Sequence, residues 1–238
     1  MHLKNTQFGL NEEQQAILDA ADQFGKKELF PLSEKMDNEE WWPDGIFKKM
    51  ADVGLLGLTV DTKYGGAGME YMQAGLVCQA FGRWNHAIAL SWVAHDNLCL
   101  DNIYRNGSDY IKEKYLPGLC SGELIGALGL TEPGSGSDSL GSMRTSAKKE
   151  GDHYILNGSK TYITNGSIAD IVLVYAKTDF NQKNKGITAF VIETNNPGFK
   201  VVSKLKKMGF RGSQTTELFF ENFKVPAKNI LGEEGKGH

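Results

Sequence analysis

Residues 128–138, Leu-Gly-Leu-Thr-Glu-Pro-Gly-Ser-Gly-Ser-Asp, stand where the helical pattern of the chain gives way to a strand pattern. Pro133, Gly134 and Gly136 prevent a helix from continuing here and leave the backbone free to turn. Consecutive unpaired amides in a turn form a concave cluster of donors, and small side chains let a phosphate come close. The stretch predicts an anion-binding loop, although an ordinary Gly-Ser surface loop has the same letters.

A second stretch, residues 154–166, follows with the sequence Tyr-Ile-Leu-Asn-Gly-Ser-Lys-Thr-Tyr-Ile-Thr-Asn-Gly. An apolar run leads to Asn157-Gly158, a pair that favours a tight turn, and a second run of β-branched and aromatic residues ends at another Asn-Gly pair, at Asn165. The pattern predicts a hairpin with its turn at Asn157-Gly158.

Together the two stretches resemble the flavin-binding signatures of the acyl-CoA dehydrogenase family, a T-E-P-x-x-G-S-D loop followed by a K-x-[WYF]-I-T-N-G strand. The resemblance continues through residues 186–190, 208–213 and 225–232, so it covers nearly the whole chain. Residues 94–99 and the segment from 105 to 117 look most like the isovaleryl or short-branched-chain members. The resemblance therefore implies FAD as cofactor and a short or branched acyl-CoA as substrate.

Composition excludes several other classes of protein. The 238 residues are 40% apolar, enough for a proper core, and the net charge of −3 includes no basic block suited to nucleic acid. No stretch approaches the roughly 18 apolar residues that span a bilayer. The three cysteines and five histidines are scattered without metal-ligand spacing. The chain reads as cytoplasmic, or as a processed mitochondrial matrix protein if it is eukaryotic.

The order of the elements predicts an α+β protein, because runs of helices come first and runs of strands follow. The helices are expected over 11–30, 46–53, 71–82, 87–104 and 109–119, and the strands over 154–156, 161–164, 171–176, 187–193, 201–205 and 217–225. We expect an N-terminal helical domain over 1–122 and a small antiparallel β-barrel or sandwich over 123–238, with the boundary near Gly122. The family implies the barrel.

The resemblance implies a role for each residue of the two signatures. The pyrimidine side of the flavin ring would meet backbone groups of Leu128 and Leu130 and the hydroxyl of Thr131. Gly136 and Ser137 would meet the pyrophosphate. The strand would supply Tyr162, Ile163 and Thr164, with Tyr162 stacking beside the ring where many members carry Trp and Thr164 donating to N5. On pattern alone, Tyr162 and Thr164 are equally ordinary alternating strand residues.

For the acyl-CoA, the resemblance pairs Ser137 with the tip of the loop over 180–185, where Asn184 and Lys185 would hold the pantetheine and phosphate. Lys185 is equally well a solvated loop charge. The helix over 87–104 would line the acyl pocket with Ser91, Ala94 and Leu98, although the same residues also suit an ordinary core.

His95 and Asp96 are adjacent in the sequence, so their side chains point about 100° apart on a helix and do not suit one substrate atom. We interpret them as hydrogen-bonded structural groups. Arg211, between glycine-containing turns, suits either an anion contact or a structural turn, and we favour the turn.

The implied reaction removes a Cα proton with a carboxylate while hydride leaves Cβ for the flavin. We assign no catalytic residue in this chain, because Gly235-Lys236-Gly237-His238 stands where family members continue into a C-terminal four-helix domain. That domain supplies the catalytic glutamate and most contacts of a homotetramer, so this chain alone is not expected to turn over substrate. Electron-transfer flavoprotein is the expected acceptor.

Two alternatives stay open at this stage. One is an acyl-CoA oxidase or flavin monooxygenase on the same fold. The other is a non-catalytic module that binds acyl-CoA or serves in assembly.

Overall fold

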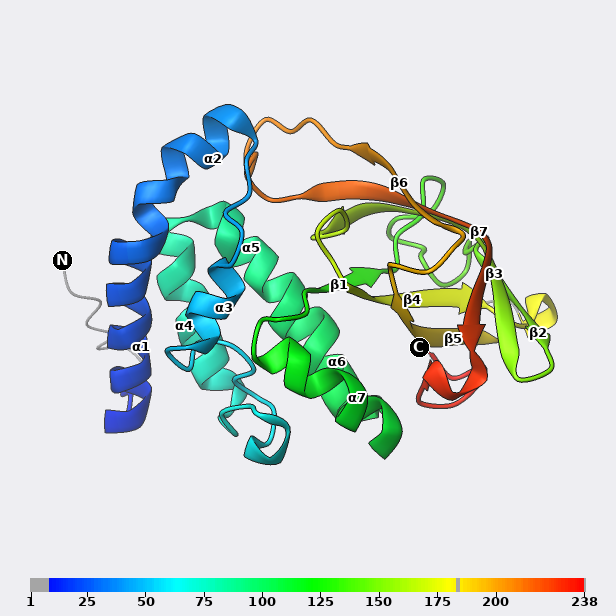
Figure 1. The fold of residues 1–238 in the computed structure, drawn as a ribbon, viewed down its shortest axis with the longest axis horizontal. Coiled ribbons are helices and arrows are strands. Elements are labelled where there is room, and N and C mark those ends of the chain that lie inside the picture. Colours follow the sequence, from blue (N-terminus) through cyan, green and yellow to red (C-terminus); the bar gives the residue numbers. More distant parts are fainter. Residues whose placement is uncertain (1–8, 183–184, 238) are drawn as a thin grey trace.

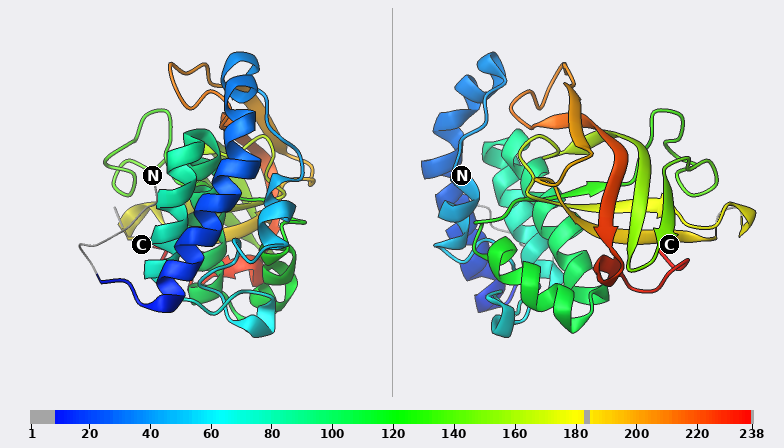
Figure 2. Two further views of the ribbon diagram at one scale, coloured as in Figure 1. Left: turned by 90° about the vertical axis from the view of Figure 1, so that its left-hand side faces the viewer. Right: turned by 45° about the vertical axis from the view of Figure 1, so that its right-hand side comes forward.

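The computed structural model describes residues 9–182 and 185–237, in which a layer of helices lies beside one curved sheet (Figures 1 and 2). The α-helices are α1 (Glu12–Phe24), α2 (Ser33–Glu39), α3 (Ile46–Ala51), α4 (Tyr71–Trp84), α5 (His86–Val93), α6 (Asp101–Asn106) and α7 (Asp109–Cys120). The strands are β1 (Gly126–Gly129), β2 (Ser146–Glu150), β3 (His153–Thr164), β4 (Ile171–Lys177), β5 (Ile187–Glu193), β6 (Phe199–Lys204), β7 (Thr215–Pro226) and β8 (Ile230–Leu231). The predicted order of helices before strands is confirmed.

The first helix begins as the sequence predicts and continues further. Asn11 accepts from the amide of Gln14 at 2.8 Å, and the Gln14 side chain accepts from the amide of Asn11, which completes a capping box. The helix end expected at residue 30 is a change of helix type instead. A π-helical turn (Gly25–Leu29) and a 3₁₀ turn (Phe30–Leu32) carry the chain into α2, because Pro31 stands at the start of the 3₁₀ turn.

The helix expected over 87–104 is interrupted by a π-helical segment, Ala94–Leu100, between α5 and α6. A π-helical turn holds more residues than an α-helical one, so the side chains after Ala94 rotate away from the face that an α-helix would give them. Such segments are frequent at functional sites. Ser91 and Ala94 are buried, whereas Leu98 is 42% exposed.

The strands form one sheet in the order β6-β7-β3-β2-β4-β5-β8, and β1 pairs in parallel with β4. Among the described residues, the edge strands β6 and β8 do not pair with each other, so the sheet does not close. The barrel that the family implied is therefore corrected to an open, sandwich-like sheet, and the expected antiparallel α+β class holds. Most neighbours pair antiparallel.

The predicted hairpin at Asn157-Gly158 is wrong, because residues 153–164 form the single strand β3. Gly158 has φ +148°, and a Cβ there would lie 2.6 Å from Cα of Thr145, so the glycine permits close approach of β2. Asn157 Oδ1 accepts from the amide of Asn222 on β7 at 2.8 Å. The Asn-Gly pair thus serves a bulge between three strands instead of a turn.

Three strands, β1, β2 and the two-residue β8, were not predicted. β1 is short and glycine-bounded, and β2 is mostly exposed and charged, so neither carries the apolar alternation that predicts a strand. One core cluster joins Ile103 and Leu116 of the helices to Leu173 and Val191 of the sheet, which fixes the two layers against each other. In residues 9–182 and 185–237, no helix is long and apolar enough to cross a membrane, and no group of side chains suits a metal ion.

Candidate functional site

The loop over 130–142 is braced by its own hydrogen bonds. Glu132 and Ser135 exchange two backbone hydrogen bonds, of 3.1 and 3.0 Å, around the Pro133-Gly134 turn. Ser135 Oγ donates to the carbonyl of Asp138 at 2.6 Å. Gly136 and Ser137, between these anchors, are exposed, and their amides donate to no acceptor within the described part of the chain. The loop thus presents free donors on a fixed backbone.

The structure brings this loop and β3 together. The amide of Thr161 donates to the carbonyl of Thr131 at 2.8 Å. Lys160 Nζ donates to the carbonyl of Leu130 at 3.1 Å and to Glu132 Oε1 at 2.9 Å. Three consecutive loop residues are therefore fastened to two consecutive strand residues.

Tyr162 stands out from β3 with a strained backbone. Its φ is +58°, a region that L-residues with large side chains rarely occupy, and the residue is 69% exposed. The register of β3 against β7 shifts between Lys160 and Ile163, because one extra residue stands in β3. This bulge turns Tyr162 toward solvent while Lys160 and Ile163 stay buried. Such strain persists where the surrounding structure enforces it, and it concentrates at functional sites.

Asn165 anchors the end of the same strand. The residue is fully buried with φ +65°, and its Nδ2 donates to the carbonyls of Ser91 at 2.8 Å and Gly126 at 3.1 Å. It therefore ties β3 to both α5 and β1, just beyond the half-buried Thr164. The sequence predicts Asn165 only as a turn residue, and the signal for its role is that Asn tolerates a left-handed backbone.

A buried ion pair lies beneath the loop. Lys160 is 0% exposed and Glu132 is 6% exposed. Burial opposes ionisation of Glu132, but Lys160 and hydrogen bonds from Thr145 and the Arg144 amide outweigh it and hold its pKa below the usual value. Burial lowers the pKa of Lys160 to about 8 against the attraction of Glu132. Sequence reasoning missed Lys160, although a lysine at an inward position of an alternating strand was the available signal.

The predicted acyl-CoA residues are dispersed. Ser91 is fully buried, and its Oγ lies 3.1 Å from Ser213 Oγ. Ala94, three residues later, is also buried. Leu98 is exposed, and Lys185 is exposed after the 3₁₀ turn Phe180–Gln182. Asn184 lies outside the described residues.

His95 and Asp96 have structural partners, in agreement with their interpretation. His95 Nδ1 accepts from the amide of Gly126 at 2.9 Å, so Nε2 carries the proton and donates to the carbonyl of Leu119 at 3.1 Å. Asp96 Oδ1 accepts from the amide of Gly57 at 2.6 Å. Burial lowers the pKa of His95 to about 4 and raises that of Asp96 to about 7.

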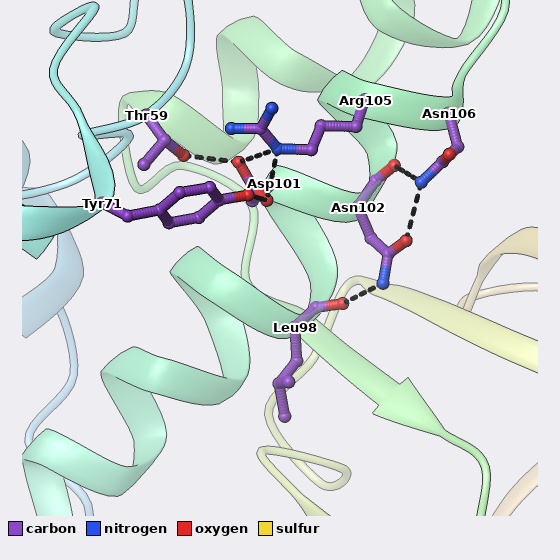
Figure 3. Close-up of polar contacts among 7 residues, drawn as sticks. All are labelled: Thr59, Tyr71, Leu98, Asp101, Asn102, Arg105 and Asn106. Atoms are coloured by element: carbon purple, nitrogen blue, oxygen red, sulfur yellow. Dashed lines mark hydrogen bonds and ion pairs between the residues drawn. The ribbon is translucent and has the colours of Figure 1, made fainter. Parts of the chain in front are cut away.

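Figure 3 shows a second buried carboxylate, that of Asp101, which connects helical segments near Leu98. Asp101 accepts from Thr59 Oγ1 and from the hydroxyl of Tyr71, each at 2.6 Å, and pairs with Arg105 at 3.0 Å. These bonds fasten the segment over 59–71 to the helix one turn beyond Leu98. Arg211, between β6 and β7, pairs with Glu40 at 3.3 Å, so the anion that it contacts is a carboxylate of this chain.

The loop and β3 are joined by hydrogen bonds and leave Gly136, Ser137 and Tyr162 exposed. One cavity of about 560 Å³ lies elsewhere, lined by residues of α1 and α3 such as Phe24 and Val53. The free loop amides could bind an anion, and the exposed ring of Tyr162 and the half-buried hydroxyl of Thr164 could contact a planar group.

Comparison with known proteins identifies the family of the chain. Residues 11–123 match the acyl-CoA dehydrogenase N-terminal domain, and residues 127–223 match the middle domain of the same family. The chain therefore belongs to the acyl-CoA dehydrogenase family. The family is FAD-dependent.

Three relatives show how far the likeness extends. Isovaleryl-CoA dehydrogenase of Pongo abelii is 46% identical over 96% of this chain and 55% of its own length. Butyryl-CoA dehydrogenase of Megasphaera elsdenii aligns with TM-score 0.92 and 40% identity over 97% of this chain and 61% of its own. A glutaryl-CoA dehydrogenase of Mycobacterium smegmatis, in complex with FADH2, aligns with TM-score 0.88 and 34% identity over 95% of this chain and 57% of its own. The chain thus spans little more than half the length of these relatives.

Proposed function

We propose that this chain forms the flavin-facing part of an FAD-dependent oxidoreductase that converts a short or branched acyl-CoA to its trans-2-enoyl-CoA. The observation that carries the proposal is the contact between the two signatures, in which Thr161 and Lys160 of β3 hold Leu130 and Thr131 of the loop. The isovaleryl-CoA and butyryl-CoA dehydrogenases among the relatives support the substrate class.

The residues present fit the parts of FAD. The free amides of Gly136 and Ser137 suit the pyrophosphate, because small residues let an anion reach them. The exposed ring of Tyr162 suits stacking against the isoalloxazine. The Leu130 carbonyl is already engaged by Lys160, so its amide and the Thr131 hydroxyl are the groups left for the ring's polar edge. FAD, when bound, supplies the hydride acceptor.

In this proposal the residues of this chain bind and orient FAD and the acyl-CoA, and none of them acts as the catalytic base. Thr164 places a hydroxyl at the end of β3, in line with the role that the family resemblance gives it at N5. Glu132 is an unsuitable base, because its carboxylate accepts from Lys160, Arg144 and Thr145. We therefore propose a base from outside these 238 residues, which matches the share of the relatives that the chain spans.

The partners follow the same reasoning. Ser137 and Lys185 are exposed and remain candidates for the pantetheine and phosphate, and Ser91, Ala94 and Leu98 for the acyl pocket. Electron-transfer flavoprotein as acceptor and a homotetrameric full-length form are parts of the proposal. We place the boundary between the helical and sheet domains near Gly122.

A flavin titration tests the proposal. FAD is added to the chain and binding is followed by quenching of flavin fluorescence, in the wild type and in Ser137→Asp. The new carboxylate would repel the pyrophosphate, so the affinity should fall about tenfold or more. Asn196→Asp adds the same charge in the turn between β5 and β6 and should leave the affinity unchanged.

Two outcomes would contradict the proposal. One is the absence of saturable FAD binding by the wild type. The other is equal loss of affinity in both charge variants, because it would place the pyrophosphate elsewhere. Binding of an acyl-CoA without any flavin binding would favour the non-catalytic module.

A further inference from the structure

We propose that the buried Lys160–Glu132 ion pair positions the flavin-binding loop: by holding the Leu130 carbonyl it leaves the Leu130 amide and the Thr131 hydroxyl where the ring of FAD requires them. This inference rests on the proposed function, and it assigns a positioning role to two residues that do not themselves face the ligand.

The ion pair forms hydrogen bonds with the backbone at both ends of the loop. At the first end of the loop, Lys160 Nζ donates to the carbonyl of Leu130. At the other end, Glu132 Oε2 and Oε1 accept from the amides of Arg144 and Thr145 at 2.7 and 2.9 Å. Glu132 Oε1 also accepts from Lys160 at 2.9 Å. One lysine and one carboxylate therefore fix both ends of the segment that carries Gly136 and Ser137.

Stability alone does not explain two buried charges at this place. Removing two ions from water is costly, and well-packed apolar residues of similar volume often give an equal or greater stability. An apolar pair, however, would leave the Leu130 carbonyl and the amides of Arg144 and Thr145 without their partners. The charged pair fixes directions that an apolar pair cannot.

The pair also lies beside the strained bulge. Lys160 is the last residue in register with β7 before the shift that turns Tyr162 outward, and the next residue, Thr161, donates to Thr131. A change at Lys160 therefore moves the loop and the aromatic side chain together. Small displacements of such supporting residues weaken a site even when the binding groups themselves are intact.

A double variant separates positioning from folding. Lys160→Met with Glu132→Gln removes both charges, so no buried ion is left alone. Its FAD affinity and its urea unfolding midpoint are compared with wild type and with a matched control, Lys200→Met with Glu221→Gln. That control removes an ion pair of the same 2.9 Å length from the surface between β6 and β7.

The double core variant should unfold near the wild-type midpoint yet bind FAD about tenfold more weakly or worse. The control should match wild type in both measurements. Glu132→Asp keeps the charge but its shorter side chain cannot reach Lys160 and the amides of Arg144 and Thr145 equally well, so it should also weaken FAD binding. If the double variant does not fold, Glu132→Asp alone tests the positioning role.

Wild-type FAD affinity in a folded double variant or in folded Glu132→Asp would overturn this inference and leave the proposed function standing. Absence of FAD binding in the wild type and the surface control would overturn the proposed function itself, and this inference with it.

Discussion

Two buried groups of ionisable residues, one in each half of the molecule, differ in what lies above them. Lys160 and Glu132 form a pair of opposite charges beneath an exposed loop and the strained Tyr162. His95 and Asp96 lie in the helical half and bind backbone groups of Leu119, Gly126 and Gly57, and both are 0% exposed. Burial of ionisable side chains therefore does not mark a site by itself. The site is where such a group supports free donors and an exposed, strained residue.

The largest expected loss of stability follows from removing one charge of the Lys160–Glu132 pair. Lys160→Met leaves Glu132 buried without its cation, so the unfolding free energy should fall by about 3–5 kcal/mol. Urea unfolding measures it. The double variant with Glu132→Gln should recover most of this loss, and a double variant as unstable as the single one would contradict an unpaired Glu132 charge as the cause.

A smaller loss is expected at the strand end shared by the two halves. Asn165→Ala leaves the carbonyls of Ser91 and Gly126 without their donor, which should cost about 2–3 kcal/mol. Asn165→Gly is the control, because glycine accepts the positive φ while still losing the amide. Glycine should be the more stable variant by about 1 kcal/mol in the same measurement. Equal stability would exclude backbone strain as part of the cost.

The buried pair His95 and Asp96 should make the free energy of unfolding depend on pH. Asp96 has its pKa raised to about 7, so it stabilises the fold less as pH rises from about 4 to 7. His95, with its pKa lowered to about 4, contributes the opposite slope between about 4 and 6.5. Asp96→Asn removes only the first slope. The unfolding free energy of the variant minus that of wild type should therefore increase up to about pH 7 and then level off. Urea unfolding across this range checks it, and a flat difference would contradict the buried titration.

The smallest effect on stability is expected at Tyr162. Tyr162→Gly relieves the positive φ and removes an exposed ring, so stability should stay equal or rise by up to about 1 kcal/mol. Tyr162→Ala removes the ring but keeps the strain and should be less stable than the glycine variant. Thermal unfolding compares the two, and marked destabilisation by glycine would show that the ring packs against the fold.

Local signals predicted most of the fold. The capping residue Asn11 and the helical periodicity placed the helices, and the apolar run over 187–193 coincides with β5. Signals failed where a distant partner decides the conformation. Thr145 makes Gly158 part of a strand instead of a turn, and β2 is held by its neighbours although it lacks an apolar pattern.

The site was predictable only in part for the same reason. The family resemblance identified the loop and Tyr162, Ile163 and Thr164, whose roles toward a flavin stay predictions. The roles of Lys160 and Asn165 are visible only in the structure, because their partners stand far from them in the sequence. A sequence shows which residue types are present, and it does not show which buried donor meets which acceptor.

The most direct test of the loop and strand as one FAD site compares FAD titrations of wild type and Tyr162→Gly under identical conditions. The account predicts saturable binding by wild type and an affinity about tenfold weaker in the variant, because stacking on the ring is lost while the fold stays intact. Equal affinities in two equally stable proteins would contradict it.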